Sequence, residues 1–120
     1  MIQSIEPRLR VVFYRTAAGT EPVREWLLNL AREDRRRMGE DIKTVQFGWP
    51  LGMPLVRPLG AGLFEVRTDL GGRIARVLFL ADGGWMVLLH AFIKKSRKTP
   101  GDDLDLARRR AADLRRENAR

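Results

Sequence analysis

The pattern of apolar and polar positions predicts a strand followed by two helices in the N-terminal part of the chain. Residues 9–14 are rich in β-branched and aromatic side chains, which is typical of a strand. Apolar residues then recur every three to four positions in two stretches, as on one face of a helix. The first follows Thr20, a predicted N-cap, with Pro22 in its first turn, and the second covers residues 33–47. Because a short polar link joins them, we expect an antiparallel helical hairpin.

Three apolar runs in the second half predict an antiparallel meander. They cover residues 63–68, 73–80 and 85–94, and Gly-rich turns of the kind that close β-hairpins separate them. The last run is apolar at almost every position, which indicates that both of its faces are covered. The helical hairpin supplies one cover, and either a C-terminal helix or a partner supplies the other. Residues 48–62 are rich in Gly and Pro and predict a loop or extended crossover.

The C-terminal part predicts one more helix. Thr99 and Asp102 fit a capping box, with Thr99 as the cap and Pro100 as the first helical residue. Small and apolar residues follow at helical spacing, with acids early and arginines late, as the helix dipole favours. The prediction is therefore an α+β fold in a single domain over residues 1–120. An antiparallel sheet of about four strands packs on an N-terminal helical hairpin, with a C-terminal helix.

The amino-acid composition limits which partners and which kinds of site the protein can have. A formal net charge of +8 favours a polyanionic partner such as nucleic acid, an anionic membrane or an acidic protein. The chain has no Cys, which excludes disulfides, thiolate metal sites and a Cys nucleophile. With one His and no clustered carboxylates, we expect neither a metal site nor a cofactor. No apolar stretch reaches the length of a membrane span, and the N-terminus lacks the apolar region of a signal peptide, so a cytoplasmic location is expected.

The last predicted strand runs directly into a group of cations. These are Lys94, Lys95, Arg97 and Lys98, four positive charges within five residues. Such a group either contacts phosphate or forms a solvated basic turn.

Further arginines lie on the meander. Alternation along the first of its strands places Glu65 and Arg67 on the face opposite its apolar residues. Arg73 begins the second strand, and Arg76 lies in its middle among apolar neighbours, where an unpaired cation is costly. The alternative to a binding role for Arg76 is a structural ion pair with Glu65 or Asp69.

His90 is the only histidine of the chain. Alternation predicts that it shares one face of its strand with Met86, Leu88, Phe92 and Lys94. It is either a packed structural residue or a general base whose pKa nearby cations hold down.

This set of groups suits one reaction in particular. The sequence contains neither a Gly-rich phosphate loop nor a recognisable Ser-His-Asp arrangement. Cations with one imidazole suit RNA cleavage, because RNA carries its own nucleophile in the 2′-hydroxyl group and cations stabilise the charge that develops on the phosphate. Proton transfer then falls to His90, a lysine of lowered pKa, or Glu65.

Several segments together resemble the RelE/ParE toxin superfamily of bacterial type II toxin–antitoxin systems, and most closely its HigB-type, phage-derived branch. The segments are residues 58–67, 73–79, 88–95 and 98–100, with Ala107 and Arg110 beyond them. The resemblance covers nearly the whole chain, and it rests on the order and spacing of these segments.

The resemblance implies a small RelE-like α+β fold, metal-independent and ribosome-dependent cleavage of mRNA, and neutralisation by a cognate helix-turn-helix antitoxin. It assigns catalytic roles to Arg67, Arg73, Arg76, Lys94 and Lys95, with His90 as a candidate acid or base. We also expect RNA contacts from Arg57, Arg97 and Lys98. Two alternatives remain. One is a toxin of the same fold with another target, such as a gyrase poison, and the other is a non-catalytic basic module that binds RNA or protein.

Overall fold

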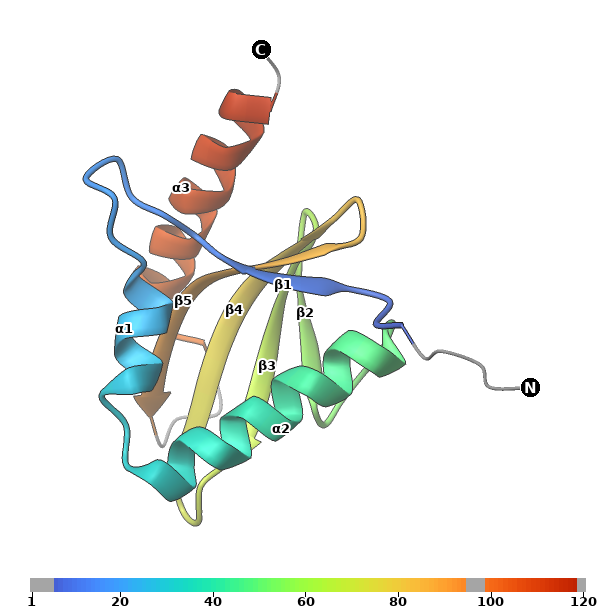
Figure 1. The fold of residues 1–120 in the computed structure, drawn as a ribbon, viewed down its shortest axis with the longest axis vertical. Helices are drawn as coiled ribbons and strands as arrows, with labels where there is room; N and C mark the ends of the chain where they lie inside the picture. Colours follow the sequence, from blue (N-terminus) through green and yellow to red (C-terminus); the bar gives the residue numbers. More distant parts are fainter. Residues whose placement is uncertain (1–5, 95–98, 119–120) are drawn as a thin grey trace.

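A five-stranded mixed sheet between helices forms the framework of the protein (Figure 1). The computed structural model describes residues 6–94 and 99–118. The strands are β1 (Arg10–Phe13), β2 (Val56–Gly60), β3 (Leu63–Asp69), β4 (Ile74–Asp82) and β5 (Trp85–Lys94), in the order β1-β5-β4-β3-β2, and the helices are α1 (Pro22–Leu28), α2 (Arg32–Gly48) and α3 (Gly101–Asn118). The predicted α+β class is confirmed, but the sheet has one strand more than expected.

The predicted meander forms the centre of the sheet. β3 pairs antiparallel with β4, and β4 pairs antiparallel with β5. β1 adds to the other side of β5 in parallel, with Val12 opposite Val87. Because β5 lies between β1 and β4, its first half is paired on both sides, which agrees with its nearly continuous apolar sequence.

The extra strand lies in the segment predicted as a loop. β2 pairs antiparallel with β3 at the edge of the sheet, with Val56 opposite Val66 and Arg57 opposite Glu65. Pro58 is compatible with this position because an edge strand has one side on which no backbone donor is needed. The predicted loop or extended crossover is therefore confirmed for residues 49–55, and the Gly and Pro residues of β2 lie in an edge strand.

The predicted antiparallel helical hairpin is wrong. α1 contacts β5 and β1, whereas α2 contacts β3, and the two helices form an open V over one face of the sheet (Figure 1). Each helix buries its apolar stripe against the sheet, so neither needs the other as a cover. The N-cap of α1 is Glu21, so the predicted cap Thr20 is wrong by one residue. The Thr20 hydroxyl lies 2.6 Å from the hydroxyl of Thr16 instead.

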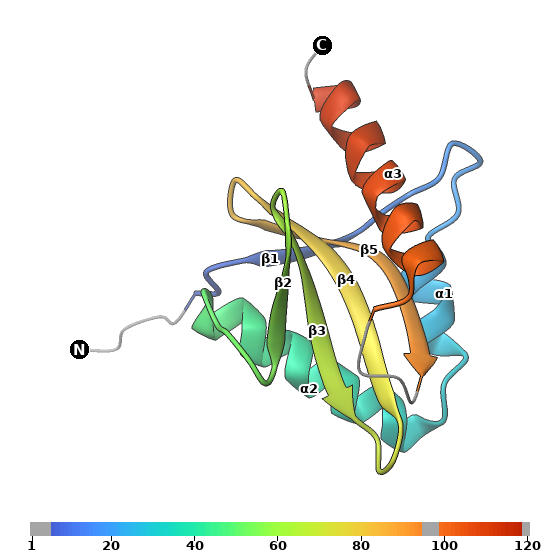
Figure 2. The same ribbon diagram turned by 180° about the vertical axis from the view of Figure 1, so that it is seen from behind.

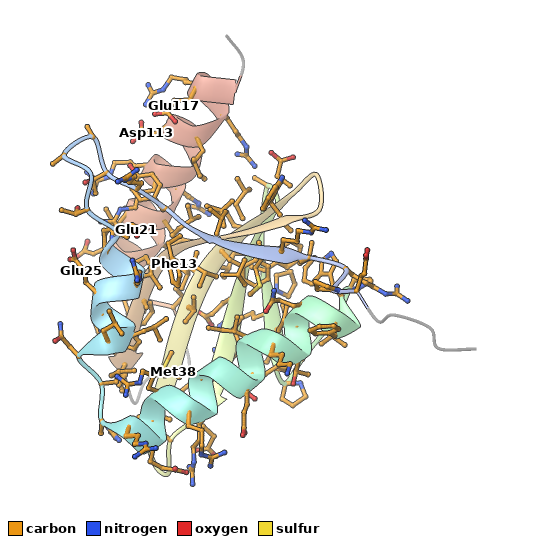
Figure 3. The ribbon with its side chains drawn as sticks, viewed as in Figure 1. Phe13, Glu21, Glu25, Met38, Asp113 and Glu117 are labelled. Carbon is orange, nitrogen blue, oxygen red and sulfur yellow. The ribbon has the colours of Figure 1, made fainter. Side chains whose placement is uncertain are left out.

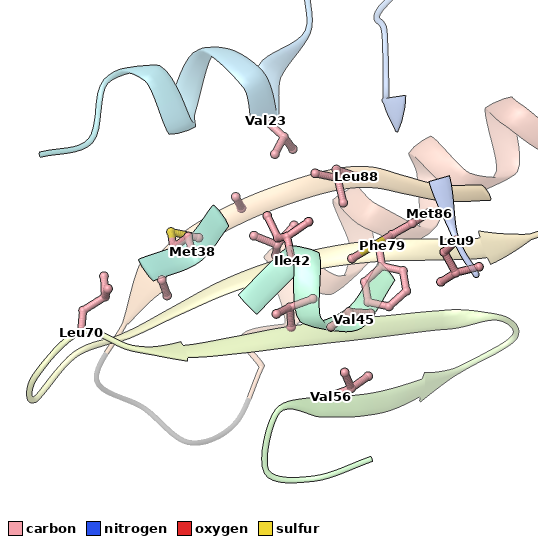
Figure 4. Packing of buried hydrophobic residues seen from close by; sticks show 14 residues of the cluster. Leu9, Val23, Met38, Ile42, Val45, Val56, Leu70, Phe79, Met86 and Leu88 are labelled. Carbon is pink, nitrogen blue, oxygen red and sulfur yellow. The ribbon is translucent and has the colours of Figure 1, made fainter. Parts of the chain in front are cut away.

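The core beneath these two helices is one continuous cluster (Figure 4). Val23 of α1 and Met38, Ile42 and Val45 of α2 point toward the sheet, where Phe79 and Leu88 are among the residues that meet them. An aromatic group extends this cluster, with the Trp49 ring edge-on to Phe64 at a centroid distance of 4.8 Å. The packing fixes β3, β4 and β5 from one side.

The opposite face of the sheet is covered by α3 (Figure 2). Ala107 and Ala111 are fully buried against leucines of β4 and β5, because their small side chains let the helix approach the sheet closely. The C-terminal helix is thus the second cover of β5 that the sequence predicts as one of two possibilities.

A bulge in β5 changes which residues face α3. Leu78 lies opposite His90, but its neighbour Phe79 lies opposite Leu88, so Leu89 is the extra residue. Met86 and Leu88 consequently belong to the core under α1 and α2, whereas Phe92 belongs to the core under α3. The prediction that His90 shares a face with Met86 and Leu88 is therefore wrong, because a one-residue insertion reverses the alternation.

Replacing Ala107 by Leu should destabilise the protein by about 1–3 kcal/mol, because the larger side chain pushes α3 away from the sheet. The control is Ala112→Leu, since Ala112 is exposed on the same helix and the change there should stay within about 0.5 kcal/mol. Urea unfolding measures both. Equal effects of the two substitutions would contradict the packing of α3 through its alanine stripe.

Candidate functional site

Charged side chains from four strands meet on the face of the sheet that α3 covers. The strand register places Arg57 opposite Glu65 and Arg67 opposite Arg76. The next strand brings His90 opposite Leu78, Phe92 opposite Arg76 and Lys94 opposite Ile74. The strand-face cluster, as we name it, comprises Arg57, Glu65, Arg67, Arg76, His90 and Lys94, together with Asp103 of α3. In Figure 2, α3 extends from this face toward one end, and β3 and β5 end toward the other.

Glu65 holds the cluster together from inside the protein. Its side chain is 0% exposed. One carboxylate oxygen, Oε1, accepts a hydrogen bond from Arg67 Nη1 at 2.9 Å, and the other, Oε2, accepts one from the Thr99 hydroxyl at 2.7 Å. A buried carboxylate requires such partners, because its desolvation is otherwise unfavourable. Glu65 therefore ties the start of the C-terminal segment to the middle of β3.

This bond also corrects the predicted capping box. α3 begins at Gly101, and the Leu104 N–H donates to the carbonyl oxygen of Pro100, which makes Pro100 the residue before the helix. The predicted cap is therefore wrong by one position, because the carbonyl oxygen of Pro100, and not that of Thr99, accepts the first hydrogen bond of the helix. The Thr99 hydroxyl donates to the buried carboxylate of Glu65 on β3.

Arg76 is the most unusual member of the cluster. It is 0% exposed, and Nε, Nη1 and Nη2 have no hydrogen-bond partner among the described residues. Its guanidinium carbon lies 5.9 Å from the centre of the Phe92 ring. Burial lowers the pKa of Arg76, Glu65 opposes that effect, and Arg67 and Arg57 add to it. A buried guanidinium in this state lacks the acceptors that usually satisfy such a group.

The structural ion pair considered for Arg76 is not formed within the described residues. Glu65 is bonded to Arg67 and Thr99, and Oδ1 of Asp69 accepts a hydrogen bond from the Gly71 N–H at 2.8 Å. Counted as formal charges, the four cations of the strand-face cluster meet two carboxylates, so the cluster carries +2. This excess favours an anion over a cation.

His90 is oriented by the first turn of α3. Its Nε2 lies 2.6 Å from Oδ1 of Asp103, and the other oxygen of Asp103 lies 3.7 Å from Nζ of Lys94. Because an ionised carboxylate can only accept, Nε2 carries the hydrogen, which leaves Nδ1 as the nitrogen that can take a proton. A carboxylate that orients an imidazole in this way is a common arrangement around a general base.

The other predicted site residues are placed differently. Arg73 lies at the turn between β3 and β4, where its Nη2 is 3.3 Å from Oδ2 of Asp34 on α2. It is therefore not brought into the strand-face cluster. Lys95, Arg97 and Lys98 lie outside the described residues. Of the predicted residues, the structure brings together Arg57, Arg67, Arg76, His90 and Lys94.

Sequence reasoning did not find Asp103 as a site residue. Because other acidic residues are next to it, Asp103 was interpreted as one of several acids that stabilise the N-terminus of the helix through its dipole. A usable signal was present, because Asp103, Ala107 and Ala111 are spaced by four and so share the face of α3 that packs on the sheet. Phe92 and Thr99 were also not recognised as neighbours of the strand arginines.

Several acidic side chains outside the strand-face cluster lie along the side that α1 and α3 share. Figure 3 shows Glu21 and Glu25 on α1 and Asp113 and Glu117 on α3. Asp113 pairs with Arg116 and lies 3.5 Å from the Tyr14 hydroxyl, and burial together with Asp113 raises the pKa of Tyr14. Of these acids, Asp113 thus connects α3 to the residue that follows β1.

The described residues form neither a cluster of metal ligands nor a membrane-spanning helix. Within residues 6–94 and 99–118, no three side chains of the His, Cys, Asp and Glu types come together as potential metal ligands. No helix in the described part of the chain is long and apolar enough to cross a membrane.

Comparison with known protein families assigns the chain to one of them. The model of the family described as phage derived protein Gp49-like (DUF891) matches residues 25–112. The protein belongs to this Gp49-like family. The match contains every residue of the strand-face cluster and the first two thirds of α3. A comparison with curated proteins gave no match to the chain.

Replacing Arg76 by Met should leave the free energy of unfolding unchanged or raise it by up to about 4 kcal/mol. The substitution removes a buried charge that has no hydrogen-bond partner and keeps an apolar side chain in its place. Urea unfolding checks this. The matched control is Arg67→Met, which strips buried Glu65 of a partner and should cost about 3 kcal/mol. If Arg76→Met is as destabilising as the control, Arg76 serves the fold.

Replacing Thr99 by Val should destabilise the protein by about 1–3 kcal/mol, because Oε2 of Glu65 loses its hydroxyl donor. Thr44→Val is the control, since the Thr44 hydroxyl bonds to an exposed carbonyl on α2 and its loss should change stability by about 0.5 kcal/mol or less. Thermal unfolding of the two variants decides. An unchanged midpoint for Thr99→Val would show that Glu65 does not depend on this bond.

Proposed function

We propose that this protein is the toxin of a type II toxin–antitoxin system, a HigB-type member of the RelE/ParE superfamily that cleaves mRNA on the ribosome. The observation that carries the proposal is the buried Arg76 guanidinium without a hydrogen-bond partner among the described residues, set beside three further cations and an oriented histidine. Membership of the phage-derived Gp49-like family is consistent with a toxin-like role.

The proposed chemistry is a metal-independent transfer at the phosphodiester. His90 Nδ1 removes the proton of the 2′-hydroxyl group, the 2′-oxygen bonds to phosphorus, and the bond from phosphorus to the 5′-oxygen breaks. The products are a 2′,3′-cyclic phosphate and a 5′-hydroxyl end. Arg76 and Arg67 stabilise the negative charge that develops on the phosphate oxygens, which is most effective in a site that excludes water.

Two further assignments follow from the contacts. Lys94 has a side chain that is 49% exposed and lies at the end of β5, so it suits protonation of the departing 5′-oxygen. Glu65 is less suited to proton transfer, because Arg67 and Thr99 already occupy its two oxygens. Its role in this proposal is to position Arg67.

The partners of the proposed toxin follow from charge and resemblance. A chain of net charge +8 suits both the ribosome with its mRNA and an acidic surface on an antitoxin. We propose a helix-turn-helix antitoxin as the partner that neutralises it. The proposed site of action is the cytoplasm, where translating ribosomes are found.

Removing the proposed base should lower cleavage while leaving the fold intact. We expect His90→Ala or Lys94→Ala to reduce the rate of mRNA cleavage on translating ribosomes by about 10²-fold or more, the usual contribution of a general acid or base. Lys43→Ala is the control, since Lys43 is an exposed lysine of α2, on the other side of the sheet, and its loss should leave the rate unchanged. Mapping of mRNA 5′ ends in a purified translation reaction measures all three.

Other outcomes, in this reaction and after induction of the protein in cells, point to different functions. Intact mRNA together with DNA damage after induction would overturn mRNA cleavage in favour of a gyrase poison of the same fold. Salt-dependent RNA binding with no cleaved ends under any ribosome condition would overturn it in favour of a non-catalytic binding module.

A further inference from the structure

An open groove of about 670 Å³ lies beside the strand-face cluster. β2 pairs with β3 only as far as Val66, so the last part of β3 forms one wall of the groove. The segment that precedes β2 supplies Met53 and Leu55, the turn between β3 and β4 contributes Ile74, and α2 contributes Asp41. The size is in the range of small-molecule sites, although the groove is open to solvent.

Arg67 connects the groove to the cluster. The same side chain that bonds Glu65 also lines the groove. Arg67 is therefore next to both the cluster and any group that occupies the groove. The geometry favours a ligand that carries both a phosphate and a flat, partly apolar group.

The lining of the groove matches such a flat group. Met53, Leu55 and Ile74 provide an apolar surface, and Met53 is 60% exposed, so it is available to a ligand. Methionine and leucine side chains pack well against the face of a nucleobase. Of the other charged groups of the groove, Asp69 has one oxygen, Oδ1, bonded to the Gly71 N–H, and Arg73 pairs with Asp34.

Asp41 is the carboxylate of the groove that has both oxygens available for recognition. It lines the groove and makes neither an ion pair nor a hydrogen bond with any side chain of the described residues. A carboxylate accepts hydrogen bonds only, so it reads amino groups of bases. Adenine, cytosine and guanine carry an exocyclic amino group. Uracil offers one ring N–H between two carbonyl oxygens, which repel a carboxylate.

We propose that this groove is a nucleobase subsite in which Asp41 selects bases with an exocyclic amino group and disfavours uracil next to the cleaved bond. The inference rests on the proposed function, since it concerns the RNA whose phosphate the strand-face cluster binds. Asp41 is in this view a specificity-determining residue that touches the substrate and takes no part in proton transfer.

The experiment compares the mRNA ends that wild type and Asp41→Asn produce on translating ribosomes. We expect wild type to avoid uracil by about tenfold at one position beside the cleaved bond, the discrimination typical of one well-placed pair. In Asp41→Asn the bias should fall to about twofold, because an amide offers both a donor and an acceptor. Asp105→Asn is the control, since Asp105 is exposed on α3 and its loss should leave the bias intact.

The outcomes separate this inference from the proposed function. Cleavage by both proteins with the same base distribution would overturn the nucleobase subsite and leave the proposed function standing. A complete absence of cleaved ends with wild type would overturn the proposed function and the subsite with it. Met53→Ala gives a second check, because loss of the stacking surface should lower cleavage several-fold for every base and leave the uracil bias unchanged.

Discussion

The structure is organised around a buried positive charge. Arg76 occupies the middle of a central strand, has no hydrogen-bond partner among the described residues and lies beside Phe92. Desolvation of such a group opposes folding, and within the described residues the Phe92 ring and the charge of Glu65 are what offset it. In the function proposed above, an anion that binds at Arg76 supplies both the missing charge and the missing acceptors.

The surrounding elements position this charge. The register of β3, β4 and β5 aligns Arg67, Arg76 and Phe92 in one row. The bulge at Leu89 turns His90 toward the same face, and the buried alanines of α3 bring Asp103 within hydrogen-bond distance of it. Glu65 then ties Thr99 to β3, so the entry to α3 is held on the cluster. One polar site thus depends on the sheet, the bulge and the helix together.

The features that follow from local pattern could be predicted from the sequence. Alternation and Gly-rich turns gave the meander, and the continuous apolar run of β5 indicated two covered faces. The set of strand cations followed from the same alternation, together with a family resemblance. The predictions that failed depend on contacts between residues distant in the sequence or on a local irregularity.

The sheet decides how α1 and α2 are oriented, and pairing with β3 makes β2 a strand. One inserted residue decides which face His90 occupies, and a carboxylate 34 residues away decides where the Thr99 hydroxyl donates.

The most direct test of the central claim is the thermal midpoint in sulfate compared with chloride at equal ionic strength, for wild type and Arg76→Met. Sulfate is a small tetrahedral oxyanion with the charge and acceptors that the Arg76 guanidinium lacks, and a ligand that binds only the folded state stabilises it. The account predicts that sulfate raises the midpoint of wild type by more than that of Arg76→Met. Equal increments in the two proteins would contradict it, because the stabilisation would then come from general salt effects and Arg76 would not be an anion-binding group.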